Sequence, residues 1–328
     1  MKYKALLIGL GQIGMGYDYD ENLESSDLML SHAQTLSKHK SFDLIGGVDK
    51  CLESQKKFSK KFGKPAYNTY LEAIKQGNLD LVVVAIPTES HLEMIKEILS
   101  VSKPKLIILE KPLAYTSDEI NSIMKIGRDK GVPLAVNYFR AYEPVHKNLS
   151  ENLASGSLGF PLTAVIKYTN GIINNGSHWV QYISSFLGKL ERIDLHAHTK
   201  ISDNDFNAEI KISFKNGTAH FLPFEQTDFY LFELDIYGPL GKISIASSGK
   251  NIMEYLSEYD ENFKDYKILP DNPILLHPDM DGYQKYIYDE ASLFLEDKSS
   301  LSCSTESLQT TVDIFSNLEK QFKKQFVG

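Results

Sequence analysis

A short apolar run that leads directly into three glycines constrains this chain more than any other feature. Residues 5–8 form a predicted strand, and Gly9, Gly11 and Gly14 follow it at the spacing of a strand–turn–helix connection. The first glycine makes a tight turn, the second lets the backbone approach a pyrophosphate, and the third lets a helix start pack closely on the strand. The pattern predicts a dinucleotide site, although a glycine-rich turn also serves as an ordinary loop.

An acidic residue that binds the cofactor ribose is expected about twenty positions beyond the last glycine. Asp49 ends a predicted strand at 43–48 and lies 35 positions past Gly14, or 18 once the 17 residues 15–31 are set aside. We therefore expect residues 15–31 to be an insertion and Asp49 to bind the ribose. The alternative is a strand-end turn aspartate. An aspartate favours NAD because it repels a 2′-phosphate, whereas Lys50 leaves NADP open.

The insertion is rich in tyrosine and acidic residues. Three interpretations are open for it: a lid over the cofactor, a site for a divalent ion, and a mobile polar loop, of which the last is favoured. A helix is expected to start at Ser31, after the insertion. The residues concerned are Tyr17, Asp18, Tyr19, Asp20 and Glu21.

Strands and helices alternate through the rest of the first half. Strands are expected at 79–86, 106–109 and 134–138, and helices at 52–62, 69–76, 90–99 and 117–130. This alternation predicts a doubly wound parallel sheet, in which ligands bind at the carboxyl ends of the strands. Lys111 and Asn137 follow two such ends, and we expect both at the site.

From about residue 160 the chain changes to short alternating segments that are typical of antiparallel strands. These segments are 163–168, 192–197, 209–214, 219–222, 232–237 and 242–245, with helices near 177–187, 281–296 and 305–324. They predict an α+β domain with one large, mostly antiparallel open sheet. We expect a Rossmann domain at 1–135 and a substrate-binding and oligomerisation domain at 136–328, and leave open that the C-terminal helices pack back on the first domain.

One face of so large a sheet needs a cover. We expect a second copy of the chain to supply it, giving a homodimer or homotetramer through the C-terminal sheet. A monodisperse monomer in light scattering would contradict this expectation.

Composition excludes several classes of function. The 328 residues suit two domains, and 35 Lys and Arg against 43 Asp and Glu give a net charge of −8, which disfavours a nucleic-acid or acidic-membrane partner. Cys51 and Cys303 lack metal-ligand spacing, so we expect no metal and a reducing, cytoplasmic compartment. No apolar run approaches the length that spans a bilayer.

Six short motifs, taken in order, resemble the Gfo/Idh/MocA oxidoreductases, the group of glucose–fructose oxidoreductase and inositol dehydrogenase, over essentially the whole chain. The motifs are residues 9–14, 48–49, 85–91, 110–113, 137–140 with Pro144, and 176–178. The resemblance implies NAD(P) in the first domain and a sugar or cyclitol-like substrate on the face of the second domain's sheet. It also implies that Lys111 and His178 stand beside the nicotinamide.

The resemblance has one departure. Family members commonly carry aspartate at two places that Asn174 and Gln181 hold here. The variant, together with the long insertion, resembles members associated with bacterial surface-polysaccharide or nucleotide-sugar metabolism.

Hydride transfer at a carbinol carbon requires a group that exchanges the hydroxyl proton and a donor that stabilises the developing oxyanion. Lys111 suits the donor role, although a lysine before proline is more often a solvated loop residue. His178 suits the acid–base role because imidazole titrates near neutrality, although it could instead pack on Trp179. Asn174 can orient a hydroxyl or the imidazole through its amide.

The expected catalytic residues are Lys111, His178 and Asn174. The expected cofactor-binding residues are Gly9, Gly11, Gln12, Ile13, Gly14, Asp49, Pro87, Thr88, His91, Glu110, Lys111 and Asn137. The expected substrate-binding residues are Tyr138, Arg140, Tyr168, Asn175 and Trp179. For Tyr138 and Arg140 the alternative is a cap on the interdomain connection, and for Tyr168 a sheet-face aromatic. We expect structural roles for His196, His198 and His220.

The expected activity is NAD(P)-dependent hydride transfer to or from a sugar, sugar derivative or nucleotide sugar. One alternative is a glycoside-processing enzyme that recycles a tightly bound NAD. The other is a dinucleotide-binding sugar sensor or regulator without turnover. Turnover separates the sensor from the enzymes, and retention of the nucleotide through gel filtration separates the two enzymes.

Overall fold

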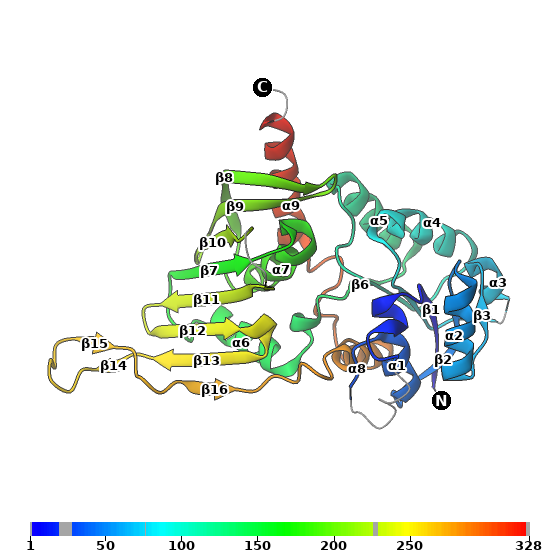
Figure 1. The fold of residues 1–328 in the computed structure, drawn as a ribbon, viewed down its shortest axis with the longest axis horizontal. Helices are drawn as coiled ribbons and strands as arrows, with labels where there is room; N and C mark the ends of the chain where they lie inside the picture. Colours follow the sequence, from blue (N-terminus) through cyan, green and yellow to red (C-terminus); the bar gives the residue numbers. More distant parts are fainter. Residues whose placement is uncertain (1, 20–27, 76, 226–228, 326–328) are drawn as a thin grey trace. The chain divides into compact units, whose positions relative to one another are not determined.

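The computed structural model describes residues 2–19, 28–75, 77–225 and 229–325. The chain forms two compact units (Figure 1). The first consists of Met1–Tyr142 and Asp281–Leu308, and the second of Glu143–Met280 and Gln309–Gly328. Each unit therefore contains two separate segments of the chain. The boundary expected between residues 135 and 136 stays a prediction.

The first unit is built on a six-stranded sheet with the strand order β3-β2-β1-β4-β5-β6, in which all neighbours are parallel. The strands are β1 (Tyr3–Ile8), β2 (Phe42–Val48), β3 (Ala66–Tyr67), β4 (Leu81–Val84), β5 (Leu106–Leu109) and β6 (Leu134–Val136). Every residue of β4 and β5 is buried, as in a strand covered on both faces. The predicted doubly wound parallel sheet is confirmed.

Helices follow the strands of this sheet. They are α1 (His32–Lys38), α2 (Leu52–Phe62), α3 (Tyr70–Ile74), α4 (His91–Val101), α5 (Ser117–Lys130) and α8 (Gln284–Leu295), with short turns η1 (Gln12–Gly16), η3 (Thr88–Ser90) and η4 (Phe139–Ala141). Local signals set their ends. Thr116 and Glu119 form a capping box at the start of α5, and Gly131 ends that helix with φ 62°.

The glycine turn opens into a single π-helical turn, η1, and α1 begins only after the insertion. The helix expected after the insertion is thus present, and the glycine turn itself continues only as far as Gly16. Ser31 caps α1, as expected, and accepts a hydrogen bond from the backbone N–H of Gln34. The buried Asp18 carboxylate accepts from the N–H of Leu30 (2.9 Å), the N–H of Ser31 (3.0 Å) and the hydroxyl of Ser31. Asp18 thereby joins the two ends of the insertion.

The second unit is built on an eight-stranded sheet with the order β16-β13-β12-β11-β7-β10-β9-β8. Its strands are β7 (Leu162–Tyr168), β8 (Leu190–Ser202), β9 (Asp205–Phe214), β10 (Gly217–Pro223), β11 (Phe232–Gly238), β12 (Gly241–Ala246), β13 (Asn251–Leu256) and β16 (Ile274–Leu276). All neighbours are antiparallel except β7 and β10. The large, mostly antiparallel sheet is confirmed.

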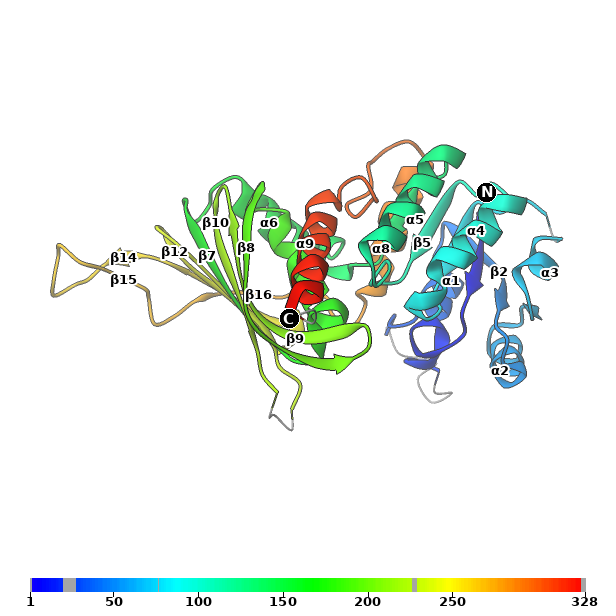
Figure 2. The ribbon, with the colours of Figure 1, turned by 90° about the horizontal axis from the view of Figure 1, so that it is seen from above.

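Burial alternates along the strands of this second sheet. On β7, Leu162, Ala164 and Ile166 are buried, whereas the intervening Thr163 and Val165 are not. The helices of this unit are α6 (Pro144–Ala154), α7 (Ser177–Ser184) and α9 (Gln309–Gln325), with turns η5 (Gly171–Gly176) and η6 (Ser247–Gly249) and a small hairpin of β14 (Glu258–Tyr259) and β15 (Lys267–Ile268). Figure 2 shows α6 and α9 on one side of the sheet. We infer that the buried apolar side chains lie on the face of the sheet that the helices cover.

None of the helices in the described part of the chain is both long and apolar enough to cross a membrane.

Candidate functional site

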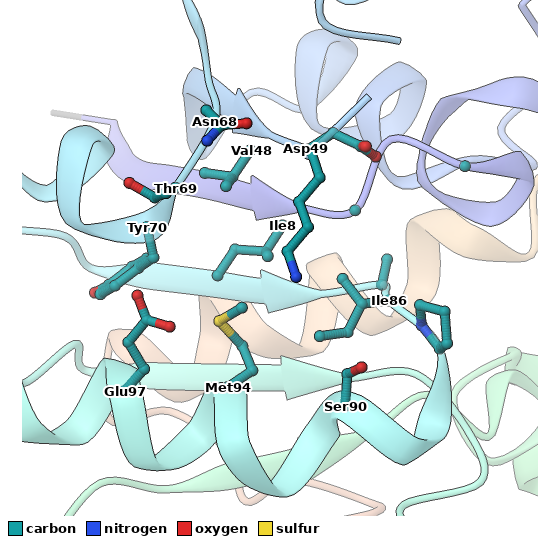
Figure 3. A pocket seen from close by; sticks show the side chains of 15 residues that line it. Ile8, Val48, Asp49, Asn68, Thr69, Tyr70, Ile86, Ser90, Met94 and Glu97 are labelled. Atoms are coloured by element: carbon teal, nitrogen blue, oxygen red, sulfur yellow. The ribbon is translucent and has the colours of Figure 1, made fainter. Parts of the chain in front are cut away.

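A cavity of about 430 Å³ lies at the carboxyl ends of β1, β2 and β4 (Figure 3). The glycine turn, the end of β2 with Asp49 and Lys50, residues 68–70 at the start of α3, residues 85–87 and one face of α4 line it. This size suits a ligand-binding cleft, and the carboxyl ends of parallel strands are where such sheets bind ligands. The cavity lies entirely within the first unit.

The three glycines of the turn differ in what the protein itself demands of them. Gly9 has φ 97°, and a Cβ there would lie 2.2 Å from the carbonyl oxygen of Ala85. A Cβ on Gly14 would lie 2.1 Å from the carbonyl oxygen of Gly9. Gly11 has φ −77°, and a Cβ there would meet no atom of the described part of the chain within 4 Å. Packing thus explains Gly9 and Gly14, whereas the glycine at 11, which lines the cavity, fits a ligand that approaches the backbone.

Asp49 is tied to the backbone on both sides of the cavity mouth. Its Oδ2 accepts from the N–H of Leu10 (2.8 Å), and its Oδ1 accepts from the N–H of Cys51 (2.8 Å). A carboxylate has about four acceptor positions, so two remain for ribose hydroxyls. Both interpretations of Asp49 therefore agree with its place, because it holds the strand-end turn and also lines the cavity.

The sequence matches the model of the oxidoreductase family with the NAD-binding Rossmann fold over residues 3–138. Over these residues the chain therefore carries the NAD-binding Rossmann domain of the Gfo/Idh/MocA oxidoreductases, and the predicted resemblance is confirmed there. The cavity and the glycine turn of this domain fit a dinucleotide.

Known proteins extend the likeness beyond the first unit. Scyllo-inositol 2-dehydrogenase (NAD(+)) of Bacillus subtilis (strain 168) is 24% identical over a 229-residue alignment, which covers 63% of this chain and 66% of that protein, just under two thirds of its length. The structure of a UDP-N-acetylglucosamine 3-dehydrogenase from Acidithiobacillus ferrooxidans superposes with a TM-score of 0.74 at 11% identity, covering 96% of each chain. A 3-ketoreductase mutant from Actinomadura kijaniata, in complex with TDP-benzene and NADP, gives 0.73 at 14% identity, also covering 96% of each chain. At these identities the two comparisons show that the fold is shared.

Five buried side chains, His32, Glu110, Asn137, Gln284 and Tyr288, form a polar cluster that we term the buried network. Glu110 Oε1 lies 2.8 Å from His32 Nε2 and accepts from Asn137 Nδ2 at 2.6 Å. His32 Nδ1 lies 2.6 Å from the Tyr288 hydroxyl, and Asn137 Nδ2 also donates to Gln284 Oε1 at 3.1 Å. The network therefore joins α1, the ends of β5 and β6, and α8.

The charge of Glu110 is maintained inside this network. Burial opposes the carboxylate, but the hydrogen bond and charge from His32, the bond from Asn137 and the charge of Lys111 together hold the pKa of Glu110 below its ordinary value. Among the described residues, Asn137 Oδ1 is buried without a hydrogen-bond partner. Asn137 does not line the cavity, so this oxygen is an unsatisfied acceptor inside the network.

Of the remaining cofactor candidates, His91 is fully buried, with Nδ1 3.0 Å from the carbonyl oxygen of Leu113 and Nε2 3.1 Å from that of Ile86. Burial lowers the pKa of His91, although the hydrogen bonds to the carbonyl groups of Leu113 and Ile86 act in the opposite direction. His91 thus ties the loop after β4 to the loop that follows Lys111. Pro87 lines the cavity, Thr88 lies in η3, and Gln12 and Ile13 lie in η1.

Lys111 is half-buried directly after Glu110 in the first unit, whereas the other two catalytic candidates belong to the second. His178 is buried in the first turn of α7, with its ring 6.2 Å from that of Phe232. Asn174 is exposed in η5. The Asp205 carboxylate holds this turn by accepting from the N–H groups of Ile173 (2.8 Å) and Asn174 (2.9 Å).

The substrate candidates are mostly interior residues. Tyr168 is fully buried, and its hydroxyl donates to the carbonyl of Ala208 and accepts from the N–H of Ala208, both at 2.8 Å. Burial raises the pKa of Tyr168 far above its ordinary range. Trp179 stacks on Phe232 at 4.8 Å, and Asn175 donates to the carbonyl of Thr169 at 2.8 Å. Tyr168 therefore contributes to the packing of the sheet.

Tyr138 and Arg140 lie at η4 in the first unit, and both are buried. The Arg140 guanidinium lies 4.4 Å from the centroid of the Phe139 ring. Asp20 and Glu21 of the insertion lie outside the described residues. Within the described residues, no three His, Cys, Asp or Glu side chains form a group that could hold a metal ion.

The sequence did not predict one end of the cavity. Residues 68–70 line it from one side and Ser90, Met94 and Glu97 from the other. Two signals were present. Thr69 caps α3 directly after a strand, and Ser90, Met94 and Glu97 follow at spacings of four and three, which places them on one face of a helix.

Proposed function

We propose that the chain is an NAD(P)-dependent oxidoreductase that transfers a hydride between nicotinamide and a hydroxyl or keto carbon of a sugar, sugar derivative or nucleotide sugar. The cavity at Gly11 carries this proposal, because no atom of the described residues occupies the space that its missing Cβ leaves open. The family of the first unit supports the cofactor. NAD is the expected form, because the Asp49 carboxylate would repel a 2′-phosphate, while Lys50 at the same end of the cavity leaves NADP open.

Lys111 and His178 would divide the proton chemistry. Nicotinamide, when bound, supplies the hydride acceptor or donor. In the oxidative direction, His178 takes the hydroxyl proton while the carbinol C–H bond breaks, and the C–O bond becomes a carbonyl. Lys111 donates to the substrate oxygen and stabilises its developing negative charge. Asn174 lies four residues before His178 and would orient the substrate or the imidazole through its amide.

The substrate class rests on the related proteins. They include an inositol dehydrogenase, a UDP-N-acetylglucosamine dehydrogenase and a ketoreductase that binds a TDP compound. All three names describe polyols or nucleotide-linked ligands. A polyhydroxylated ring, free or attached to a nucleoside diphosphate, is therefore the proposed substrate.

A homodimer or homotetramer is proposed through the second sheet. Thr163 and Tyr237 on neighbouring strands are exposed, and Lys167 is paired with Asp235 at 3.3 Å on a polar, partly exposed strand face. A second copy could cover such a face. The exposed Cys51 and the low cysteine content support the reducing cytoplasm as the compartment.

The test compares the wild type with Lys111→Ala, His178→Ala and the control Lys125→Ala, which changes an exposed lysine on α5. Calorimetry measures the binding of NAD(H) and NADP(H), and absorbance follows the nicotinamide with a panel of polyols, sugars and UDP-, GDP- and dTDP-sugars. We expect turnover to fall by about 10² to 10⁴ in the first two variants and to persist in the control. Tight NAD binding without any turnover would instead support a sugar sensor, and absent NAD binding would contradict the proposal.

A further inference from the structure

The far end of the cavity carries one carboxylate, that of Glu97, close to Tyr70 and Met94. We propose that Glu97 binds the exocyclic amino group of the cofactor adenine and thereby selects adenine over other purines. This inference rests on the proposed use of a dinucleotide and adds the residue that recognises its base.

Helix α4 presents three cavity-lining side chains on one face. Ser90 precedes the helix, and Met94 and Glu97 follow at spacings of four and three residues. In Figure 3, Met94 and Glu97 project from the helix toward the side of the cavity where Tyr70 lies. Glu97 is half-buried, so its carboxylate is partly removed from water.

Two neighbouring hydroxyl groups already have hydrogen-bond partners. The Tyr70 hydroxyl lies 2.6 Å from Ser102 Oγ, and the Thr69 hydroxyl accepts from the N–H of Glu72 at 3.3 Å. Within the part of the chain that the structure describes, the Glu97 carboxylate has neither a cation nor a hydrogen-bond donor within bonding distance. A half-buried carboxylate lacking a donor is costly unless a ligand supplies one.

The pKa of Tyr70 is consistent with a charge nearby. Burial raises it, the bond to Ser102 opposes the rise, and the charge of Glu97 adds to it. Tyr70 therefore presents a neutral, fully buried phenol beside this end of the cavity. Met94 supplies a second apolar surface there. The two side chains suit the flat face of a purine base.

The order of groups along the cavity places the base at this end. Gly11 leaves space for the pyrophosphate and Asp49 has acceptors for the ribose. Figure 3 shows Tyr70 and Glu97 on the other side of Ile8 from Asp49. An ionised carboxylate only accepts hydrogen bonds. Adenine offers an amino group at C6, whereas hypoxanthine carries a carbonyl oxygen there, which the carboxylate would repel. Glu97 therefore favours adenine.

The experiment measures dissociation constants for NAD and for nicotinamide hypoxanthine dinucleotide by titration calorimetry. It uses the wild type, Glu97→Gln and the control Glu93→Gln, which alters a glutamate of the same helix that pairs with Lys96 at 2.7 Å and does not line the cavity. We expect the wild type and the control to prefer NAD by about tenfold or more. Glu97→Gln should reduce this preference to about twofold or less, because an amide can donate to the hypoxanthine oxygen.

Two results would overturn the inference. Equal affinities of the wild type for both dinucleotides would show that the base is not selected. A ratio that Glu97→Gln leaves unchanged, even with both affinities lowered, would assign Glu97 to the ribose or to packing. Thermal unfolding without ligand verifies that the variant is folded. Because binding is measured without a sugar, the result does not depend on turnover, and a failure of the dehydrogenase proposal would appear separately.

Discussion

The cavity and the buried network of the first unit use polar side chains in opposite ways. Around the cavity, Glu97 and Gly11 leave an acceptor and a space that the described protein atoms do not fill. In the buried network, Glu110 and His32 bond to each other and to further side chains in the interior. The side chains at the cavity can therefore bind a ligand, whereas those of the buried network hold the surrounding loops in place. The first kind should affect binding when changed, and the second kind stability.

The largest expected effect comes from breaking the buried network. Glu110→Ala should lower the free energy of unfolding by about 3–5 kcal/mol, because it leaves His32 and Asn137 buried without their acceptor. The control Glu93→Ala removes an exposed pair with Lys96 and should cost less than about 1 kcal/mol. Urea unfolding followed by circular dichroism measures both. Equal losses would erase the distinction between the two regions.

The next effect separates two neighbouring glycines. Gly9→Ala should lower the unfolding free energy by about 1–3 kcal/mol, because its methyl group meets a backbone oxygen at positive φ. Gly11→Ala should change stability by less than about 0.5 kcal/mol, yet weaken NAD binding by roughly tenfold or more, because the methyl group occupies the space for the pyrophosphate. Thermal unfolding and calorimetry measure the two quantities. Unchanged NAD affinity in Gly11→Ala would remove the evidence for a ligand at that position.

The smallest effect concerns His91, a buried residue on a helix that lines the cavity. Burial lowers the pKa of His91 in the folded protein below its value of about 6.5 in the unfolded chain. At a pH between these two pKa values, the unfolded chain therefore binds more protons than the folded protein does. Its contribution to stability is therefore complete above about pH 6.5 and is lost as the pH falls through the folded pKa, by at most about 1.4 kcal/mol per pH unit. His91→Gln should remove this slope, and the exposed His277→Gln should retain it.

Urea titrations at a series of pH values between 7 and 5 measure the slope. If His91→Gln and the wild type lose stability in parallel, the buried imidazole of His91 is not the cause of the slope.

Much of the first sheet was predictable, because each of its signals is local. The apolar strand before Gly9 and the four-residue strand before Glu110 have the continuous hydrophobicity that burial on both faces requires. Asp49 could be located by its distance from Gly14 once the insertion was set aside. The alternating strands of the second unit were likewise visible in their period of two.

The buried network was not predictable, since its members are distant in sequence. His32 and Tyr288 are separated by 256 positions, and no local pattern pairs them. Glu97 escaped notice for another reason: its polarity is ordinary on a surface helix, and only the cavity distinguishes it from Glu93. The single π turn after the glycines also lacked a signal, because it depends on where the insertion draws the chain away.

The division of each unit into two chain segments has a consequence for biosynthesis. A nascent chain that has emerged only as far as Tyr142 lacks Tyr288, which packs on Phe42 in the finished first unit. The second unit in turn lacks α9 until residues 309–325 are translated. Neither unit can therefore be completed before its second segment emerges, and we expect the apolar interiors of both units to stay open to chaperones and proteases until then. A premature stop codon after α8 would leave the second unit incomplete, and one before α8 would leave both units unfinished.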